Sequence, residues 1–186
     1  MFDPQYLRVR ARPGRLAGPK ILLDNSIHVA RYRDVRPPDR RLSLACFADA
    51  DAAIAIVARR YERMAADEPE LARNVSPAAA EDLRLWHAAG QLSAIRAGEL
   101  TVGLLAIAPG RVGWIEGDEI QEEVVDARHR GHGYAVLAQA AWARRASDPD
   151  RLLVGTIDRL NVASRKSAER AGRRRVLDDV FVPLSD

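Results

Sequence analysis

The chain has 186 residues, of which 47% are hydrophobic and 30% are charged, and this is the size and composition of one globular domain. These values exclude disordered, collagen-like and disulfide-scaffold proteins. All but two of the 29 basic residues, Lys20 and Lys166, are arginine. The formal net charge of +3 does not by itself indicate a nucleic-acid partner, because such binding needs a clustered basic face.

The compartment is predicted from cysteine content and hydrophobic runs. Cys46 is the single cysteine and has no partner for an internal disulfide, which is typical of a reducing compartment. No apolar run approaches the roughly 18 residues of a membrane span, and residues 1–20 contain no hydrophobic signal core. We therefore expect a cytoplasmic protein without a membrane partner.

Composition changes near residues 42 and 92 divide the chain into three blocks, of which the last two are expected to belong to one domain. Residues 1–41 are rich in Arg and Pro and are expected to be an N-terminal extension of unknown role that packs on the domain. Within them, residues 21–23 and 27–32 are possible strands. Residues 42–186 are expected to form a single domain.

Apolar periodicity and turn residues predict the elements of that domain in chain order. A strand at 42–47 precedes a helix that begins at 48–51 and ends at 66. A second helix is expected to begin after Ser76-Pro77 and to end at Gly90. The remaining predictions are a hairpin of 92–96 and 100–107, a turn at Pro109-Gly110, strands at 112–115 and 120–125, a glycine-rich loop, a helix at 134–145, a turn at 147–150, a strand at 152–157, a helix at 161–171 with Gly172 at its left-handed end, and a strand at 176–184. This order predicts an α/β fold with a mixed, mostly antiparallel sheet flanked by helices.

The glycine-rich loop between the strand ending at Val125 and the helix beginning at Tyr134 carries the clearest chemical signal. First-turn N–H groups of a helix have no internal partner and attract anions. Gly131 and Gly133 lack the Cβ that would hold a ligand away from the backbone. Arg128 and Arg130 would add charge-assisted hydrogen bonds to a diphosphate. A tight turn with solvated arginines explains the same residues, and neither common nucleotide-binding fingerprint is present.

Two motifs decide between these interpretations. Arg128-His129-Arg130-Gly131-His132-Gly133 matches the pyrophosphate-loop pattern R/Q-x-x-G-x-G/A of the GNAT acetyltransferase superfamily. Asn161-Val162-Ala163-Ser164 and Glu169-Arg170-Ala171-Gly172 match the N-x-x-A/S and E-x-x-G motifs that follow in that family. Over residues 92–184 the sequence therefore resembles the GNAT superfamily, and the first 41 residues lie outside the resemblance.

The resemblance implies an acetyl-CoA-dependent N-acetyltransferase, in which a primary amine attacks the thioester directly in a ternary complex. Residues 42–186 would be the acetyl-CoA-binding domain. The strand through Val124 and Val125 would pair with pantetheine, and Asn161 would contact the cofactor arm. The expected pyrophosphate contacts come from the loop and the first helical turn, namely Arg128, Arg130, Gly131, His132, Gly133, Tyr134 and Ala135.

The leaving thiolate would meet an unusual residue in this chain. Many family members have a tyrosine seven residues after the motif asparagine, and Ala168 occupies that position. Ser164 matches the serine that ribosomal-protein N-terminal acetyltransferases place beside the sulfur, and its hydroxyl would donate a hydrogen bond to the thiolate. Asn161 as a helix N-cap and Ser164 as a first-turn residue are equally accounted for by helix structure alone.

A base for the amine is expected among the acidic residues before the loop. Strand alternation places Glu119 and Glu123 on one face and Glu122 on the other, and a β-bulge would exchange these faces. Glu119 and Glu123 are the candidate catalytic carboxylates. A solvated acidic edge is the alternative for each one. As a group, which also includes Glu116 and Asp118, they suggest a cationic acceptor.

Other interpretations remain open for the rest of the sequence. His129 and His132 have no third ligand nearby, so no metal site is expected. The basic stretch from Arg165 to Arg175 would be a solvated helix face, a nucleic-acid contact or a contact with the 3′-phosphate of CoA. The family's aromatic residue after the glycine is Arg173 here, and the short tail leaves room for one long strand or a hairpin at Asp178-Asp179, so the acceptor side would be built differently or completed by another subunit.

Two other functions compete with acetyl transfer. One is a catalytically weak acyl-CoA-binding regulatory module, and the other is a nucleic-acid-binding protein that uses the basic C-terminal helix. The acceptor is open between a small-molecule amine and a protein N-terminus. A homodimer is possible on this sequence.

Overall fold

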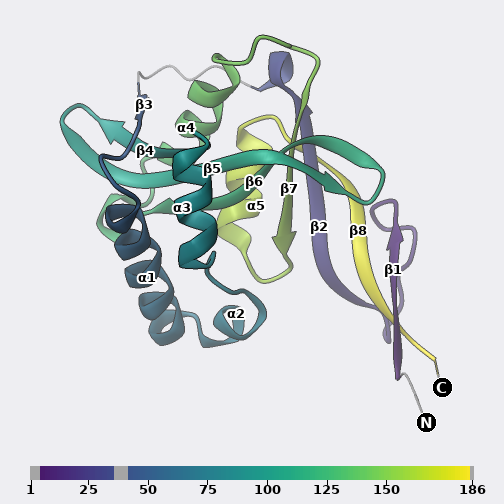
Figure 1. Cartoon of the computed structure of the whole chain (residues 1–186). Helices are drawn as coiled ribbons and strands as arrows, with labels where there is room; N and C mark the ends of the chain where they lie inside the picture. Colours follow the sequence, from purple (N-terminus) through teal and green to yellow (C-terminus); the bar gives the residue numbers. More distant parts are fainter. Residues whose placement is uncertain (1–4, 36–41, 185–186) are drawn as a thin grey trace.

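The computed structural model describes residues 5–35 and 42–184, and within them eight strands form one sheet. The strand order across the sheet is β1, β8, β2, β7, β6, β5, β4, β3 (Figure 1). All neighbours are antiparallel except β6 and β7, so the predicted mixed, mostly antiparallel α/β fold is confirmed. The strands are β1 (Tyr6–Ala11), β2 (Leu22–Arg31), β3 (Ser43–Ala45), β4 (Leu92–Ala97), β5 (Leu100–Val112), β6 (Ile115–Val125), β7 (Leu152–Asp158) and β8 (Arg174–Pro183).

Helices cover both faces of the sheet, and their apolar sides form two cores. On one face, Val57 of α1 and Leu83 of α3 pack against Leu104 and Val124 of the sheet. On the other, Leu137 of α4 packs with residues of β2, β4, β5 and β7. None of the helices in residues 5–35 and 42–184 is long and apolar enough to cross a bilayer. The helices are α1 (Ala50–Asp67), α2 (Pro69–Asn74), α3 (Ala80–Ala88), α4 (Tyr134–Ala143) and α5 (Val162–Arg170).

The N-terminal part of the chain contributes a strand to the interior of the sheet. Residues 22–31, which the sequence divides into two short strands at 21–23 and 27–32, form the continuous strand β2. β2 lies between β7 and β8 and is antiparallel to both (Figure 1). Within it Ile27 and His28 are fully buried. The composition of residues 1–41 suggested an extension outside the domain. Residues 22–31 instead pair with β7 and β8, the two strands that follow the glycine-rich loop.

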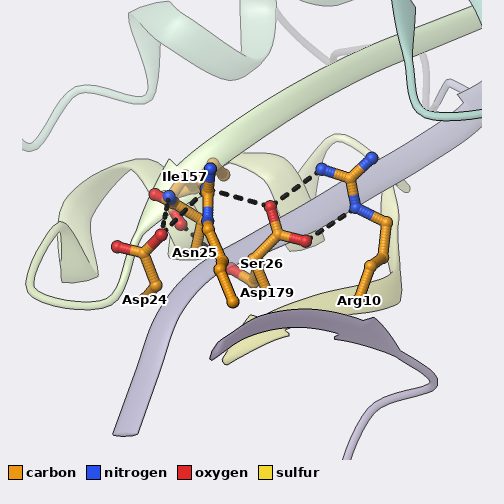
Figure 2. A network of polar contacts seen from close by, with 7 residues as sticks. Arg10, Asp24, Asn25, Ser26, Ile157 and Asp179 are labelled. Atoms are coloured by element: carbon orange, nitrogen blue, oxygen red, sulfur yellow. Dashed lines mark hydrogen bonds and ion pairs between the residues drawn. The ribbon is translucent and has the colours of Figure 1, made fainter. Parts of the chain in front are cut away.

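β1 is held at the edge of the sheet by a buried carboxylate. Arg10 donates to both oxygens of Asp179 at 2.6 and 2.8 Å (Figure 2). Arg8 donates to one of them at 3.0 Å. Asp179 is only 2% exposed, and the bonds from Arg10 hold its pKa below the ordinary value. Two guanidinium groups thus compensate the burial of one negative charge.

A bulge and a divergence in β6 shape the centre of the sheet. Opposite Ala106 and Ile107 of β5 stand Glu122 and Ile120, so Gln121 is the extra residue of a β-bulge. β6 and β7 pair at only two positions, Asp118 with Leu153 and Glu119 with Val154. Beyond these two positions, the parallel strands β6 and β7 no longer pair.

Several predicted boundaries are wrong for identifiable reasons. The helix expected to begin directly after Ser76-Pro77 begins a few residues later, at Ala80, and its N-cap is Ala79, which has no side chain that could cap the helix. Pro109 and Gly110 do not turn the chain, since they pair with Asp118 and Gly117 inside one long hairpin whose turn lies at Gly113. The short α2 is absent from the prediction, because six residues are too few for a periodic signal.

The C-terminal and helical predictions agree better with the structure. β8 is a single strand through Asp178-Asp179, not a hairpin. Asp49 caps α1 by accepting from Ala52 N at 3.0 Å, as the predicted helix start requires. Gly172 after α5 has φ +93°, the left-handed conformation expected there.

Candidate functional site

The glycine-rich loop connects β6 to α4, whose N-terminus has no side-chain cap. Gly131 and Gly133 have φ values of +82° and +75°, a conformation that side chains with a Cβ rarely adopt. Gly133 is the N-cap of α4, and no side chain caps this end. The N–H groups of the first turn therefore have no intrahelical acceptor and point out of the helix. Ideal Cβ atoms at Gly131 and Gly133 meet nothing within 4 Å, so the space over the loop is open.

This open space is a cavity of about 440 Å³, which we call the loop cavity. Arg130 and Tyr134 line it on the loop side, and Asn161 and Ser164 line it from α5. The two motifs, which are about 30 residues apart in sequence, thus border the same space. Its lining also includes Arg60, Glu68, Glu123, Val125, Gly131, Gly133, Ala135, Lys166 and Arg170.

Two of the predicted pyrophosphate contacts do not line the loop cavity. Arg128 pairs with Asp126 at 3.2 Å and lines a different cavity, which is shared with residues of α1. The ring of His132 stacks on Tyr134 with centroids 5.6 Å apart, and its Nδ1 donates to the carbonyls of His129 and Arg130. Among residues 5–35 and 42–184, no group of three His, Cys, Asp or Glu side chains is arranged to hold a metal ion.

The corner between α1 and α2 adds two residues that the sequence analysis missed. Glu68 Oε1 lies 3.7 Å from Arg130 Nη1 and 3.7 Å from Arg60 Nη2. Burial, and then the nearby Arg130 charge, lower the pKa of Arg60. Its Nη1 is buried and has no hydrogen-bond partner in the described part of the chain. In sequence Arg60 is one more charged residue on a long helix, so only the fold identifies it.

A second cavity of about 330 Å³, the sheet cavity, occupies the opening between β6 and β7. Gly155 and Thr156 line it from β7, and Tyr61 lines it from α1. Four residues line both cavities, and they mark the place where the two meet: Arg60, Glu123, Asn161 and Ser164.

Asn161 and Ser164 are also linked by helix structure. The Asn161 side chain accepts from Ser164 N at 3.1 Å, so it is the N-cap of α5. This bond uses the Ser164 backbone and leaves the hydroxyl group out of the cap. Ala168, at the position of the family's tyrosine, is fully buried, so no acid replaces the tyrosine there.

The bulge at Gln121 distributes the carboxylates in a way that simple alternation does not. Glu119 and Glu123 lie on opposite faces of the sheet. The prediction from simple alternation, which put both on one face, is therefore wrong, and the exchange of faces expected for a β-bulge is found. Glu122 faces α1, is 8% exposed, and accepts hydrogen bonds from Tyr61 Oη at 3.5 Å and Ala78 N at 3.2 Å. Glu123 faces α4, where Gln139 Nε2 donates to both its oxygens at 2.9 and 3.1 Å.

Burial raises the pKa of all three carboxyl groups, which brings them closer to the range of a general base. Glu119 is outside both cavities, beside Gly110 and Gln121 of the hairpin. Glu122 lines the sheet cavity but not the loop cavity. Of the predicted catalytic carboxylates, only Glu123 shares both cavities with Ser164.

Comparison with known proteins gives no match to a family model and no match to a curated protein sequence. Solved structures do match. A protein from Novosphingobium aromaticivorans assigned to the GNAT family superposes with a TM-score of 0.55 and 13% identity, over 99% of this chain and 77% of that one. An acetyltransferase of the GNAT family from Colwellia psychrerythraea gives 0.54 and 11%, over 89% of this chain and 57% of that one. The chain has the GNAT fold.

A GCN5-related N-acetyltransferase from Kribbella flavida also matches, with a TM-score of 0.51 and 17% identity over 89% of this chain and 60% of that one. This chain thus spans less than two thirds of the Colwellia and Kribbella proteins. Within the GNAT fold, the first sequence motif joins β6 to α4 and the second begins α5. The resemblance to the GNAT superfamily that these two motifs indicated is therefore confirmed for the fold.

Proposed function

We propose that this protein is an acetyl-CoA-dependent N-acetyltransferase acting on a primary amine. The observation that carries the proposal is the meeting of the loop cavity and the sheet cavity at Glu123, Asn161 and Ser164. One cavity has an anion-binding helix start, and the other opens between separating strands of a GNAT fold. Their junction is a place where a thioester and an amine would meet.

The residues of the loop cavity suit the diphosphate of CoA. The first-turn N–H groups of α4 and the Cβ-free surface of Gly131 and Gly133 would receive phosphate oxygens. Arg130 would add a charged donor. Glu68, which now faces Arg60 and Arg130, is the intramolecular anion that the cofactor phosphates would replace. Arg60 is then a further cofactor contact.

The chemistry is direct attack, in which the amine nitrogen forms a bond to the thioester carbonyl carbon and the carbon–sulfur bond breaks. Glu123, whose pKa is raised by burial, would take the proton that the amine loses. The departing thiolate would accept a hydrogen bond from the Ser164 hydroxyl. Asn161 would keep α5, and with it Ser164, in place by capping the helix.

The sheet cavity would hold the acceptor. Three carboxylates, Glu122, Glu123 and Asp158, line it together with two arginines, Arg60 and Arg173, and the excess of acidic groups favours an amine that arrives with a positive charge. A small-molecule amine and a protein N-terminus both satisfy this requirement. We place the reaction in the cytoplasm, since Cys46 is the single cysteine of the chain.

The test combines cofactor binding with turnover. Acetyl-CoA should raise the melting temperature, because a ligand that binds only the folded state at 100 times its Kd adds about 2.7 kcal/mol. A panel of amines should then be screened for release of free CoA thiol, with mass spectrometry of the acetylated product. No thermal shift at millimolar acetyl-CoA, with protein shown to be free of copurified CoA, would contradict the proposal. Binding without turnover of any amine would support the regulatory-module alternative instead.

A further inference from the structure

Three polar side chains form a chain of hydrogen bonds beneath the junction of the two cavities. Arg173 Nε donates to Gln139 Oε1 at 3.0 Å, and Gln139 Nε2 donates to both oxygens of Glu123 at 2.9 and 3.1 Å. The amide thus accepts from the cation with its oxygen and donates to the anion with its nitrogen. The three residues come from β6, α4 and the link between α5 and β8.

Two members of this hydrogen-bond chain, Gln139 and Arg173, are buried, and Glu123 is partly buried where it lines the two cavities. Gln139 is fully buried on a helix whose other buried residues are alanine and leucine. Arg173 is 3% exposed. Burying a charge or an amide costs free energy unless each group finds a partner, so apolar residues would fill this space at lower cost. The position of these residues under the junction is therefore better explained by what they do to Glu123 than by packing.

The backbone around Arg173 is arranged to admit its guanidinium group. Its N–H donates to Ala168 O at 2.9 Å after the left-handed turn at Gly172. On β7, a Cβ at Gly155 would collide with Arg173 Nη1, so the glycine makes room for the guanidinium group. Burial lowers the pKa of Arg173 to about 10, which leaves the group charged at neutral pH.

We propose that Gln139 and Arg173 are positioning residues that orient the Glu123 carboxylate at the junction of the two cavities and balance its charge. This inference rests on the proposed function, because the proton acceptor that it concerns is Glu123. Arg173 has no direct bond to Glu123, and its Nη1 has no partner in residues 5–35 and 42–184. Its influence on Glu123 therefore passes through the Gln139 amide and through the electric field.

The charges around Glu123 determine the sign of the effect. Burial raises its pKa, whereas the Arg173 charge and the Gln139 hydrogen bonds oppose that rise. Loss of either partner therefore moves the pKa of Glu123 further up. The other charged or titratable groups that line its cavities are Arg60 and Tyr61 of α1, Glu68, Glu122, His129, Arg130, Tyr134, Asp158, Lys166 and Arg170. All of them are retained in the variants below, so a change in the pKa of Glu123 can be ascribed to the replaced partner.

The experiment measures the titration of the Glu123 carboxyl carbon by NMR in protein labelled with ¹³C-glutamate. Glu123→Gln assigns the signal. Gln139→Met removes both hydrogen bonds with a similar side-chain volume, and Arg173→Met removes the charge. Arg144→Met is the control, because Arg144 is exposed and directly follows the helix that carries Gln139. Thermal melts check that each variant folds.

We expect the Glu123 titration to move to higher pH in Gln139→Met and Arg173→Met and to stay unchanged in Arg144→Met. In the amine assay, the acidic limb of the pH profile of kcat/KM should move in the same direction. If its midpoint rises by one pH unit, kcat/KM falls about tenfold at pH values below the parent midpoint. An unchanged titration in Gln139→Met overturns the inference even if Arg173→Met fails to fold. Shifted titrations in a protein that transfers no acetyl group would support the positioning role and contradict the proposed function.

Discussion

The loop cavity and the sheet cavity differ in how the sequence builds them. The loop side of the loop cavity is one continuous stretch, in which two glycines with positive φ lead into an uncapped helix, and α5 lines the opposite side. The sheet cavity is made by residues of α1, β6, β7 and α5 that meet only in the folded chain. A binding function can therefore be encoded locally, whereas the surroundings of a reacting group depend on long-range packing. Substitutions in each cavity can test this difference.

The largest effect is expected at the locally encoded site. Gly131→Val should weaken CoA binding about 100-fold, because its Cβ enters the open space over the loop and its backbone is left-handed. Gly98→Val is the matched control, since Gly98 has φ +62° and an equally open Cβ position in the β4–β5 turn. Isothermal titration with CoA measures both. Equal losses in the two variants would mean that strain alone, and not contact with the ligand, lowers the affinity.

The junction of the cavities is tested by the leaving-group serine. Ser164→Ala should lower kcat about 10- to 100-fold and leave CoA affinity nearly unchanged, as for an interaction made mainly in the transition state. The Asn161 cap survives, because it uses the Ser164 backbone. Ser167→Ala changes a neighbouring serine that lines the loop cavity alone and should keep the parent kcat. A Ser164→Ala enzyme with normal turnover would remove Ser164 from the mechanism.

Replacement of the two loop arginines, Arg130 and Arg128, should have different effects on CoA affinity. Arg130→Ala should weaken CoA about tenfold, with a smaller effect at high salt, because this side chain is partly exposed and its charge is screened. Arg128→Ala should change the affinity little, since Arg128 pairs with Asp126 outside the loop cavity. Affinities measured at two salt concentrations check both variants. The reverse ranking would place the phosphates on the other side of the loop.

The smallest effect, with the opposite sign, is expected at the α1–α2 corner. Glu68→Gln should tighten CoA binding about threefold, because the carboxylate that competes with phosphate for Arg60 and Arg130 is gone. Glu70→Gln, an exposed change on α2, is the control and should have no effect. Weaker binding in Glu68→Gln would show that Glu68 supports the cofactor site rather than competing with the cofactor.

The sequence by itself determined the features that depend on neighbouring residues. The left-handed glycines, the Asp49 and Asn161 helix caps and the start of α4 follow from residue types within a few positions. The two motifs spaced around α4 were sufficient to predict the GNAT fold. Short-range geometry of this kind is fixed by backbone conformation and local hydrogen bonds, so it can be predicted without knowledge of the fold.

Only the tertiary structure decided which side chains share the site. The bulge at Gln121 moved Glu119 and Glu123 to opposite faces, because one extra residue reverses the alternation of a strand. Arg60, Gln139 and Arg173 joined the site from α1, α4 and the segment before β8, and β2 entered the sheet from the other end of the chain. These contacts connect residues that are distant in sequence, and their free energy comes from burial and pairing, which no local pattern records.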